Sequence, residues 1–588
     1  MDTMRPCLSI LAITLSCLAG TAQADPIELS SETGAPDLLA AIEAELTDIA
    51  APDTLFEARR SARNAASKTE SYLNSLGYFA PEISYAVAPG EPPSAQLKVE
   101  PGPLFTFDDI AIALEPPIVS EQAADALETV RTLKPGDQAI PSAIIAEEAG
   151  LIAALKASGY ANATVTERKL VGDRAAGTLT LTYQLQPGAR IRLGDVVYEP
   201  AARTRRLYLN RLLPFESGEL FSPEKLAALS RRLNGTRFYR FVSVQLSDTV
   251  SEITAEGDEV RDVIVSSEPR ERYTLTTGTS FSTSEGPGLT ASLTRRDATR
   301  RGDTLTGSMT LATLERSFAV DWRIPNITAF DRSLVLSWDA GREETDAFDR
   351  EAVELEGVFE VRASRALTFA FGAGSEFTRE EDTFEQRDQQ VLSTFAGVRL
   401  DYADDPLDAT SGWRIDTRAE PGWVIGDREA QFLALNGQLS TYLGLDPTDH
   451  FILANRVRSG FVFGAALSDL PVSRRFFAGG GGSARGFEYQ SVGPQDADGT
   501  PTGGRGLLEV SSELRWRRDG PWGGVVFVDA ASVSADQGIQ SDDLRYSAGL
   551  GVRYDTVIGP IRFDLATPID PRDGDDPVQI YVSIGQAF

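Results

Sequence analysis

Cysteine and histidine are almost absent from this chain of 588 residues, which holds two cysteines and one histidine. Both cysteines, Cys7 and Cys17, lie near the N-terminus. The remainder of the chain therefore has no thiol, no disulfide and no cysteine ligand for zinc. A Gly-x-Ser-x-Gly nucleophile elbow is also missing, and the single histidine, His450, lies in a turn before a predicted strand. We therefore predict that the protein is not an enzyme and that it uses no metal and no cofactor.

The chain also lacks an apolar run long enough for a transmembrane helix. Residues 1–24 instead show the pattern of a secretory signal peptide. Arg5 precedes the short apolar segment Cys7–Leu18, and Ala22-Gln23-Ala24 forms a small-residue cleavage site before Asp25. Export from the cytoplasm is therefore expected. A membrane-spanning barrel stays open, because barrel strands give a much weaker sequence signal than helices.

Positive charge is scarce, with 56 Lys and Arg against 86 Asp and Glu and a net charge of −30. Such acidity argues against a nucleic-acid binder. Residues 201–240 are an exception, since they hold nine Lys or Arg and three Glu. Two interpretations of this basic stretch stay open: a solvated face that balances the acidic regions, or a surface that faces anionic lipid headgroups. The arginines assigned to such a surface are Arg203, Arg205, Arg206, Arg231 and Arg232.

The first half of the chain contains an internal repeat of about 80 to 90 residues, the size of a small domain. A helical pattern leads into Gly77-Tyr78, then into Gly159-Tyr160 one repeat later, and a weaker copy surrounds Gly235 and Phe238. The turns Pro101-Gly102 and Pro187-Gly188 repeat as well. Glycine supplies the left-handed helix cap, and the aromatic side chain anchors the next strand. We predict three α+β domains at 25–100, 101–187 and 188–268, with a generic α+β array as the alternative.

From residue 269 onward the sequence becomes a series of short segments with period-2 alternation, which is typical of β-strands, and lysine disappears. We count sixteen candidates, and the even number favours a membrane barrel over a soluble β-sandwich. The predicted strands are Tyr273–Ser282, Gly288–Arg296, Asp303–Leu311, Ser317–Ile324, Ser333–Asp339, Ala352–Val361, Leu367–Phe377, Gln389–Asp401, Trp413–Glu420, Ala430–Leu443, His450–Gly464, Arg505–Trp516, Gly523–Ala531, Leu544–Tyr554, Gly559–Ala566 and Val578–Phe588.

The longest connection between predicted strands, residues 465–504, contains the segment Arg474–Pro494 with paired aromatics, four successive glycines and the tripeptide Arg485-Gly486-Phe487. Glycines let the backbone fold back and approach other groups closely. The arginine has a rigid fork of five donors that suits carboxylates. The alternative is a flexible extracellular loop.

This segment resembles the inward-folded loop of the outer-membrane assembly-factor superfamily, whose members carry POTRA domains ahead of a sixteen-stranded barrel. Residues 512–516, 521–530 and 549–566 are similar to the TamA branch of that superfamily. The resemblance implies three periplasmic POTRA domains at 25–100, 101–187 and 188–268, and a 16-stranded antiparallel outer-membrane β-barrel at 269–588. Ala484 departs from the branch, which usually has a β-branched residue before Arg-Gly.

The resemblance also implies a function, namely assembly or translocation of barrel and autotransporter-type clients through a weak lateral seam. We expect Arg485 to bond Glu513 and Asp529 in the lumen, next to Gly486 and Phe487. At the seam we expect Tyr273 in the first strand and Gly585 and the terminal Phe588 in the last one. The implied partners are a TamB-like inner-membrane-anchored protein, unfolded client proteins and outer-membrane lipid. A two-partner secretion pore for one dedicated substrate, a component of inter-membrane lipid transport and a diffusion porin stay open.

Overall fold

The computed structural model describes residues 27–31, 36–90, 92–116, 119–200, 203–517, 520–539, 543–556, 560–572 and 574–584. The predicted signal peptide at 1–24 and the predicted seam residues Gly585 and Phe588 lie outside the described residues. Across the described ranges, no helix is both long and apolar enough to cross a membrane. Two compact units form: one comprises the described residues up to Asp195 with 215–226 and 246–263, and the other comprises 196–214, 227–245 and 264 onward.

Three small three-stranded sheets precede the larger sheet, and each is built in the element order strand, helix, helix, strand, strand. In the first two sheets, the last strand of the repeat is central and runs parallel to the first. The first repeat holds β1 (Ile27–Ser30), α1 (Pro36–Glu45), α2 (Leu55–Ser75), β2 (Glu82–Ala88) and β3 (Ser94–Glu100). The second holds β4 (Thr106–Leu114), α3 (Glu121–Val130), α4 (Pro141–Ala157), β5 (Thr164–Asp173) and β6 (Thr178–Gln186), and the third holds β7 (Ile191–Glu199), α5 (Arg206–Arg211), α6 (Pro223–Gly235), β8 (Tyr239–Ile253) and β9 (Glu259–Pro269).

The repeated glycines end helices, as the sequence predicts, in two of the three repeats. Gly77 and Gly159 have φ angles of +91° and +101°, the left-handed conformation that glycine adopts without steric cost. Tyr160 follows the second of them and is buried. In the third repeat the left-handed residue is Arg237, with φ of +59°, and not Gly235, which ends α6 itself. The weaker third copy therefore differs in how its helix ends.

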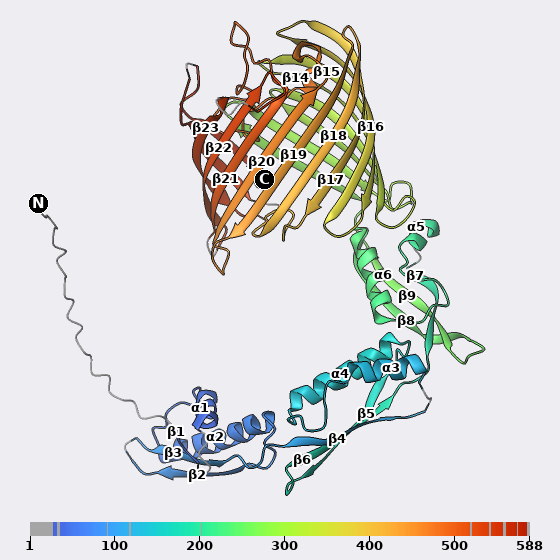
Figure 1. The fold of residues 1–588 in the computed structure, drawn as a ribbon, viewed down its shortest axis with the longest axis vertical. Coiled ribbons are helices and arrows are strands. Elements are labelled where there is room, and N and C mark those ends of the chain that lie inside the picture. Colours follow the sequence, from blue (N-terminus) through green and yellow to red (C-terminus); the bar gives the residue numbers. More distant parts are fainter. Residues whose placement is uncertain are drawn as a thin grey trace, which may run out of the picture. The chain divides into compact units, whose positions relative to one another are not determined.

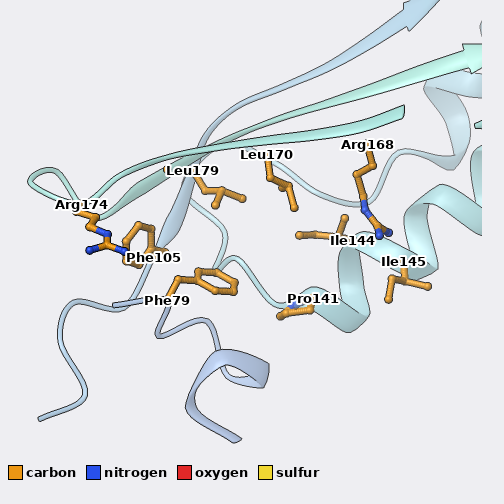
Figure 2. Close-up of a pocket in the computed structure, with 10 residues that line it drawn as sticks. Phe79, Phe105, Pro141, Ile144, Ile145, Arg168, Leu170, Arg174 and Leu179 are labelled. Carbon is orange, nitrogen blue, oxygen red and sulfur yellow. The ribbon is translucent and has the colours of Figure 1, made fainter. Parts of the chain in front are cut away.

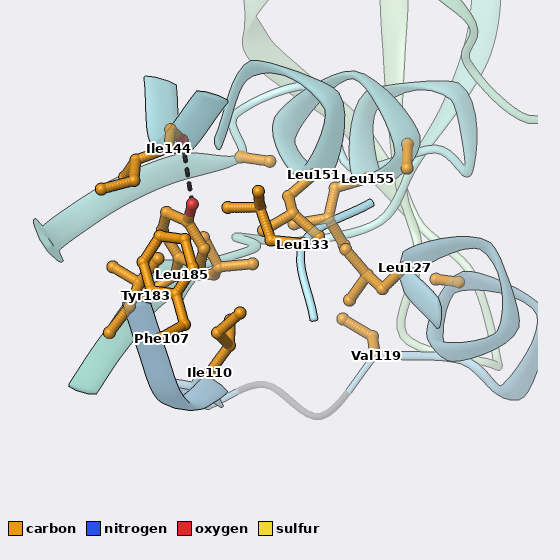
Figure 3. Close-up of a cluster of buried hydrophobic side chains, with 14 of the residues drawn as sticks. Phe107, Ile110, Val119, Leu127, Leu133, Ile144, Leu151, Leu155, Tyr183 and Leu185 are labelled. Atoms are coloured by element: carbon orange, nitrogen blue, oxygen red, sulfur yellow. Dashed lines mark hydrogen bonds between the residues drawn. The ribbon is translucent and has the colours of Figure 1, made fainter. Parts of the chain in front are cut away.

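The second repeat shows how such a small domain is stabilised. Figure 3 shows Leu151 and Leu155 of α4 packed with Phe107 of β4 and Leu185 of β6, and the cluster extends to α3. The hydroxyl of Tyr183 is buried here and donates to the carbonyl oxygen of Ile144 at 2.9 Å, the contact that is dashed in Figure 3. A buried hydroxyl needs such a partner, because an unsatisfied one would be costly to desolvate. The helices α3 and α4 of this domain thus pack against its sheet.

The second half is a closed barrel of sixteen antiparallel strands, β10 to β25, in which each strand pairs with its neighbours in sequence. Figure 1 shows them in sequence order, coloured from green through yellow to red. The strands are β10 (Tyr273–Ser282), β11 (Gly286–Arg296), β12 (Thr304–Ala312), β13 (Glu315–Ile324), β14 (Arg332–Glu344), β15 (Phe348–Arg362), β16 (Leu367–Asp382), β17 (Gln386–Asp401), β18 (Gly412–Gly426), β19 (Ala430–Gly444), β20 (Phe451–Phe463), β21 (Gly506–Arg517), β22 (Trp522–Ser534), β23 (Arg545–Tyr554), β24 (Ile561–Pro568) and β25 (Gln579–Ile584). The predicted fold class is therefore confirmed.

Barrel strands alternate between an apolar outer face and a polar inner face. On β21 the apolar Val510, Leu514 and Trp516 are exposed, whereas Ser511 and Glu513 between them are buried. An outward apolar band facing lipid and a polar interior explain this alternation in a membrane barrel. The inner face of β21 and its neighbours is what positions the site described next.

Candidate functional site

The long connection between β20 and β21 lies against the inner wall of the barrel. Its Ala478, Ala484 and Phe487 are buried in one cluster with Leu507 of β21 and Ala531 of β22. Side chains alternate between the two faces of a strand. Leu507 therefore lies on the same inward face of β21 as Glu513, and Ala531 lies on the same inward face of β22 as Asp529. The loop contains the 3-10 turns η1 (Leu467–Asp469) and η2 (Val472–Arg474) and isolated β-bridges such as that of Phe476 with Gly504. Contacts of its side chains and backbone with the wall hold it in place.

Arg485 is the central contact between the loop and the wall. Its Nη1 lies 2.7 Å from Oε1 of Glu513, and its Nε lies 2.8 Å from Oδ2 of Asp529. Nη2 lies 3.0 Å from the other oxygen of Asp529, so the guanidinium binds this carboxylate bidentately. Asp564 of β24 is a third carboxylate at 3.5 Å, and the ring of Phe527 lies 3.5 Å from the guanidinium carbon. The structure thus brings Arg485 together with both carboxylates that the family resemblance assigns to it.

This cluster of charged side chains is buried, so removing one of them changes the stability more than removing an exposed charge would. Only 2% of the Arg485 side chain is exposed, and Glu513, Asp529 and Asp564 are buried to a similar degree. The Arg485 guanidinium is thus buried among the carboxylates of Asp529, Glu513 and Asp564. A buried ion pair gains little net stability over apolar packing, but removing one partner leaves the other charge buried. Among the described residues Asp529 pairs only with Arg485, whereas Glu513 also pairs with Arg515 and Asp564 with Arg553.

Gly486 and Phe487 fix the loop beside Arg485. Gly486 has φ of +96°, and a Cβ atom there would lie 2.9 Å from the Cβ of Ser547 on β23, so the position requires glycine. Its backbone N–H donates to the hydroxyl of Tyr581 at 3.1 Å. The same hydroxyl donates to the carbonyl oxygen of Phe487 at 3.2 Å. Since Tyr581 belongs to β25, the tripeptide is bonded to the last described strand of the barrel.

A second anchor holds the start of the loop against the other side of the wall. Arg475 lies 2.7 Å from Asp382 at the end of β16, with both side chains 1% exposed. Arg474 lies 3.0 Å from Glu376 and 3.1 Å from Glu420. The loop is therefore held by arginines at two separate places on the barrel wall.

The seam between the first and last strands has few backbone pairs among the described residues. β10 and β25 pair at Phe281–Val582 and Ser282–Tyr581, whereas β10 and β11 pair through ten residues each. The N–H of Thr283 adds a bond to the carbonyl oxygen of Ile580 at 3.1 Å. Tyr273 lies at the other end of β10 and pairs with Arg295 of β11. The structure therefore does not bring Tyr273 to the described part of the seam.

The loop also contacts the strand on the other side of this seam. The backbone N–H of Gly481 donates to Oε1 of Glu285 at 3.0 Å, and Glu285 lies in the turn between β10 and β11. With Tyr581 bonded to Gly486, one loop thus contacts both flanks of the seam. The sequence does not predict the roles of Glu285, Tyr581 and Asp564, or the anchor at Arg475. The acidic Asp564 within the alternating strand Ile561–Pro568 is the one signal that was readable.

A separate apolar pocket of about 420 Å³ lies in the second small domain. Figure 2 shows Phe79 and Phe105 at one end of it, with Ile144 and Ile145 of α4 and Leu170 of β5 along its length. β5 is one of the two edge strands of its sheet and is exposed over most of its length. An exposed strand edge beside an apolar pocket is the arrangement by which a sheet accepts an additional peptide strand.

Within the described ranges, no three His, Cys, Asp or Glu residues gather in a way that could hold a metal ion. The acidic residues of the loop site are instead matched with arginines.

A closed barrel of sixteen antiparallel strands that follows three small α/β domains, with a loop bound inside by arginines, defines a class of outer-membrane β-barrel proteins. Residues 299–588 match the model of the Omp85 superfamily domain. The barrel of this chain is therefore similar to the Omp85 superfamily domain over residues 299–588.

Two curated relatives are both named outer membrane protein assembly factor BamA. The one from Nitratidesulfovibrio vulgaris is 25% identical over 447 residues, which are 73% of this chain and 55% of that protein. The one from Neisseria meningitidis serogroup B is 23% identical over 219 residues, which are 32% of this chain and 27% of that protein. The chain thus spans about half the length of the first and about a quarter of the second.

A solved structure shares the fold. The crystal structure of BamA from Haemophilus ducreyi lacking POTRA domains 1–3 matches with a TM-score of 0.68 at 17% identity, covering 82% of this chain and 100% of that one. The three small domains are accordingly POTRA-like. The protein is located in the bacterial outer membrane, and its POTRA-like domains are in the periplasm.

Proposed function

We propose that the chain is an outer-membrane assembly factor that inserts or secretes barrel and autotransporter-type proteins through the seam between β10 and β25. The observation that carries the proposal is the loop of residues 465–504, which is bound inside the barrel and contacts both flanks of a short seam. The names of the relatives, which are outer-membrane assembly factors, support it.

The mechanism is physical and needs no hydrolysable cofactor. Backbone N–H and C=O groups cannot face lipid without partners, so an opened seam must be filled by another strand or by water. A client strand satisfies this requirement by pairing with the exposed edge of β10 or β25. Among the described residues, opening the seam separates the register pairs of Phe281 with Val582 and of Ser282 with Tyr581. Enzymatic chemistry is not part of this mechanism.

The finer assignment is to the TamA branch, with a TamB-like inner-membrane-anchored protein as the partner. The motifs at 512–516, 521–530 and 549–566 support it. The domain limits proposed with it are 25–100, 101–187 and 188–268 for the POTRA domains and 269–588 for the barrel. The exposed edge of β5 and its apolar pocket support docking of unfolded clients or of the periplasmic partner in the second domain.

Reconstitution of the purified protein tests this proposal. Liposomes with the protein should convert an unfolded outer-membrane client into its protease-resistant, folded form at least tenfold faster than empty liposomes. The matched control is the variant Arg485→Ala in the same liposomes, which should lose most of the acceleration. Steady ion conductance without client insertion would contradict the proposal and favour a porin, and activity towards one dedicated exported protein would favour a secretion pore. Accelerated lipid exchange without client insertion would favour a lipid-transport component.

A further inference from the structure

A cavity of about 850 Å³ lies between helices α5 and α6 of the third repeat and the ends of the barrel strands. All residues that line it belong to the same compact unit. One side is formed by the C-terminal half of α6 and the residues after it, from Ala228 to Phe238. The other side is formed by the ends of strands β11 to β16 and their turns, including Thr294, Thr304 and Thr368. These threonines alternate with outward apolar residues such as Leu293 and Leu305, so they face the barrel interior.

Specific contacts hold the two sides of this cavity together. Arg211 donates to the carbonyl oxygen of Asn326 at 3.0 Å, and the buried amide of Asn326 donates to the hydroxyl of Tyr208 at 3.4 Å. The guanidinium of Arg232 stacks over the ring of Phe330 at 4.1 Å and donates to the carbonyl oxygen of Leu213 at 3.1 Å. The cavity is therefore a built feature of this unit and not a gap between separate bodies.

The lining of this cavity is strongly basic in a chain with a net charge of −30. Seven arginines line it, against the two carboxylates Asp331 and Glu360. Glu360 pairs with Arg323, and Asp331 lies 3.9 Å from Arg362. The lining arginines are Arg231, Arg232, Arg237, Arg296, Arg323, Arg362 and Arg365. Positive charge is thus concentrated in the cavity well beyond what the cavity's own carboxylates neutralise.

Five of these arginines have no carboxylate within ion-pair distance among the described residues: Arg231, Arg232, Arg237, Arg296 and Arg365. Arg237 also occupies the left-handed position at which the first two repeats have glycine. A side chain other than glycine at such an angle is uncommon, and strained positions of this kind gather at ligand sites. The residue with this uncommon backbone angle, Arg237, is therefore one of the residues that line the cavity.

The shape and chemistry of the cavity select the kind of anion. Guanidinium groups bind phosphate oxygens bidentately, and several around one site can match the charge of a phosphate. The volume lies within the range of small-molecule sites. An extended acidic peptide fits less well, because strands β11 to β16 are paired on both sides and offer it no free backbone edge. The arginines and threonines point to a hydrophilic anion.

We propose that this basic cavity binds a phosphate group, presented either by an anionic lipid headgroup or by a soluble phosphate ester. Basic pockets at membrane proteins are known to hold lipid headgroups, and each exposed cation near anionic lipid contributes to the attraction. None of the residues that line the cavity belongs to the loop of residues 465–504, to β10 or to β25. It also narrows the interpretation of the basic stretch at 201–240, since Arg231 and Arg232 line a cavity together with arginines of the barrel.

The test measures binding to the full chain in detergent by calorimetry at low and at physiological salt. The probes are dihexanoyl phosphatidylglycerol, dihexanoyl phosphatidylcholine, inorganic phosphate and a polyglutamate peptide. The variant carries Arg231→Gln, Arg237→Gln and Arg365→Gln. The matched control carries Arg59→Gln, Arg60→Gln and Arg63→Gln, three exposed arginines of α2 that the structure shows without an ion pair. Heat-dependent mobility in gels checks that each barrel is folded.

We expect phosphatidylglycerol to bind the wild type and the control alike, and to bind the cavity variant at least tenfold more weakly. Binding should weaken with salt, because these arginines are exposed to screening. Competition by inorganic phosphate at equal concentration would support a soluble phosphate as the ligand, and a clear advantage of phosphatidylglycerol would support a headgroup. Equal binding of a folded cavity variant and the wild type would overturn the proposal. Preferential binding of polyglutamate, or of phosphatidylcholine as tightly as phosphatidylglycerol, would also overturn it.

Discussion

The hydroxyl of Tyr581 on β25 accepts a hydrogen bond from the backbone N–H of Gly486, 3.1 Å away in the loop inside the barrel. The two residues are 95 positions apart in the sequence. Gly481 of the same loop bonds Glu285, which lies beside the first strand of the barrel. The loop is therefore attached to both strands whose separation would open the seam.

Removing the hydroxyl of Tyr581 should loosen this attachment. The variant Tyr581→Phe leaves the buried N–H of Gly486 without its acceptor and the carbonyl oxygen of Phe487 without its donor. An unsatisfied buried group costs about 1–3 kcal/mol. We expect lower thermal stability in detergent and faster proteolysis within the loop. Tyr546→Phe on β23 is the control, because Tyr546 is exposed and should change neither quantity. Equal behaviour of the two variants would rule out the attachment.

Removing the guanidinium of Arg485 should have a larger effect. Arg485→Ala leaves the buried Asp529 without its arginine, while Glu513 keeps Arg515 and Asp564 keeps Arg553, so we expect a loss of about 3–5 kcal/mol from the unpaired Asp529. We expect the loop to become sensitive to external protease and client assembly to fall. Arg485→Lys should recover little, because lysine lacks the planar fork that binds Asp529 bidentately.

The control for this prediction is an arginine in an exposed ion pair. Arg399 pairs with Asp416, and their side chains are 66% and 47% exposed. Arg399→Ala should change stability by less than about 1 kcal/mol. If Arg485→Ala kept the protease resistance and the activity of the wild type, the proposed role of Arg485 would be wrong.

The barrel itself could be predicted from the sequence because lipid and lumen impose a strict alternation on its strands. The first strand, Tyr273–Ser282, has the predicted bounds. Some strands extend further than the sequence predicts. The predicted strand Ser333–Asp339 is Arg332–Glu344 in the structure, and the predicted strand Leu367–Phe377 is Leu367–Asp382. These extensions carry charged residues on both faces, and pairs such as Arg342 with Asp349 join neighbouring strands there. Beyond the membrane both faces are polar, so the periodic signal ends before the strand does.

The loop site could be predicted only in part, since its members come from distant positions. The pairing of Arg485 with Glu513 and Asp529 was expected from a family resemblance and not from spacing. The contacts with Tyr581 and Glu285 had no local signal, because they depend on the register of β25 and on where the loop lies. The left-handed backbone angle of Arg237 could not be predicted either, because the neighbouring residues do not indicate that an arginine takes the place of the glycine.

Closing the seam covalently should stop the proposed activity. Phe281 and Val582 are register partners across β10 and β25, so cysteines placed there meet the distance that a disulfide requires. The chain has no cysteine after Cys17 to interfere. We expect the oxidised double variant Phe281→Cys, Val582→Cys to insert clients at least tenfold more slowly, with recovery after reduction. The control pair Leu289→Cys, Leu311→Cys joins β11 and β12, where register partners are equally exposed, and should be active in both states. Full activity of the oxidised seam variant would show that clients do not pass between β10 and β25.

The second small domain should respond to pH through Glu147 on α4. Burial raises the pKa of this carboxyl, and only one of its oxygens has a partner, the backbone N–H of Leu133 at 3.0 Å. Because the folded pKa lies above the unfolded one, the stability linked to this group is present in full below the unfolded pKa and is lost as the pH rises through the folded one. Glu147→Gln keeps an acceptor for Leu133 and removes the charge. Hydrogen exchange of α4 in the full chain should therefore be slower in the variant than in the wild type at pH 8, and the two should converge near pH 4 after correction for intrinsic rates. A difference that is constant from pH 4 to pH 8 would show that the charge of Glu147 does not destabilise the domain.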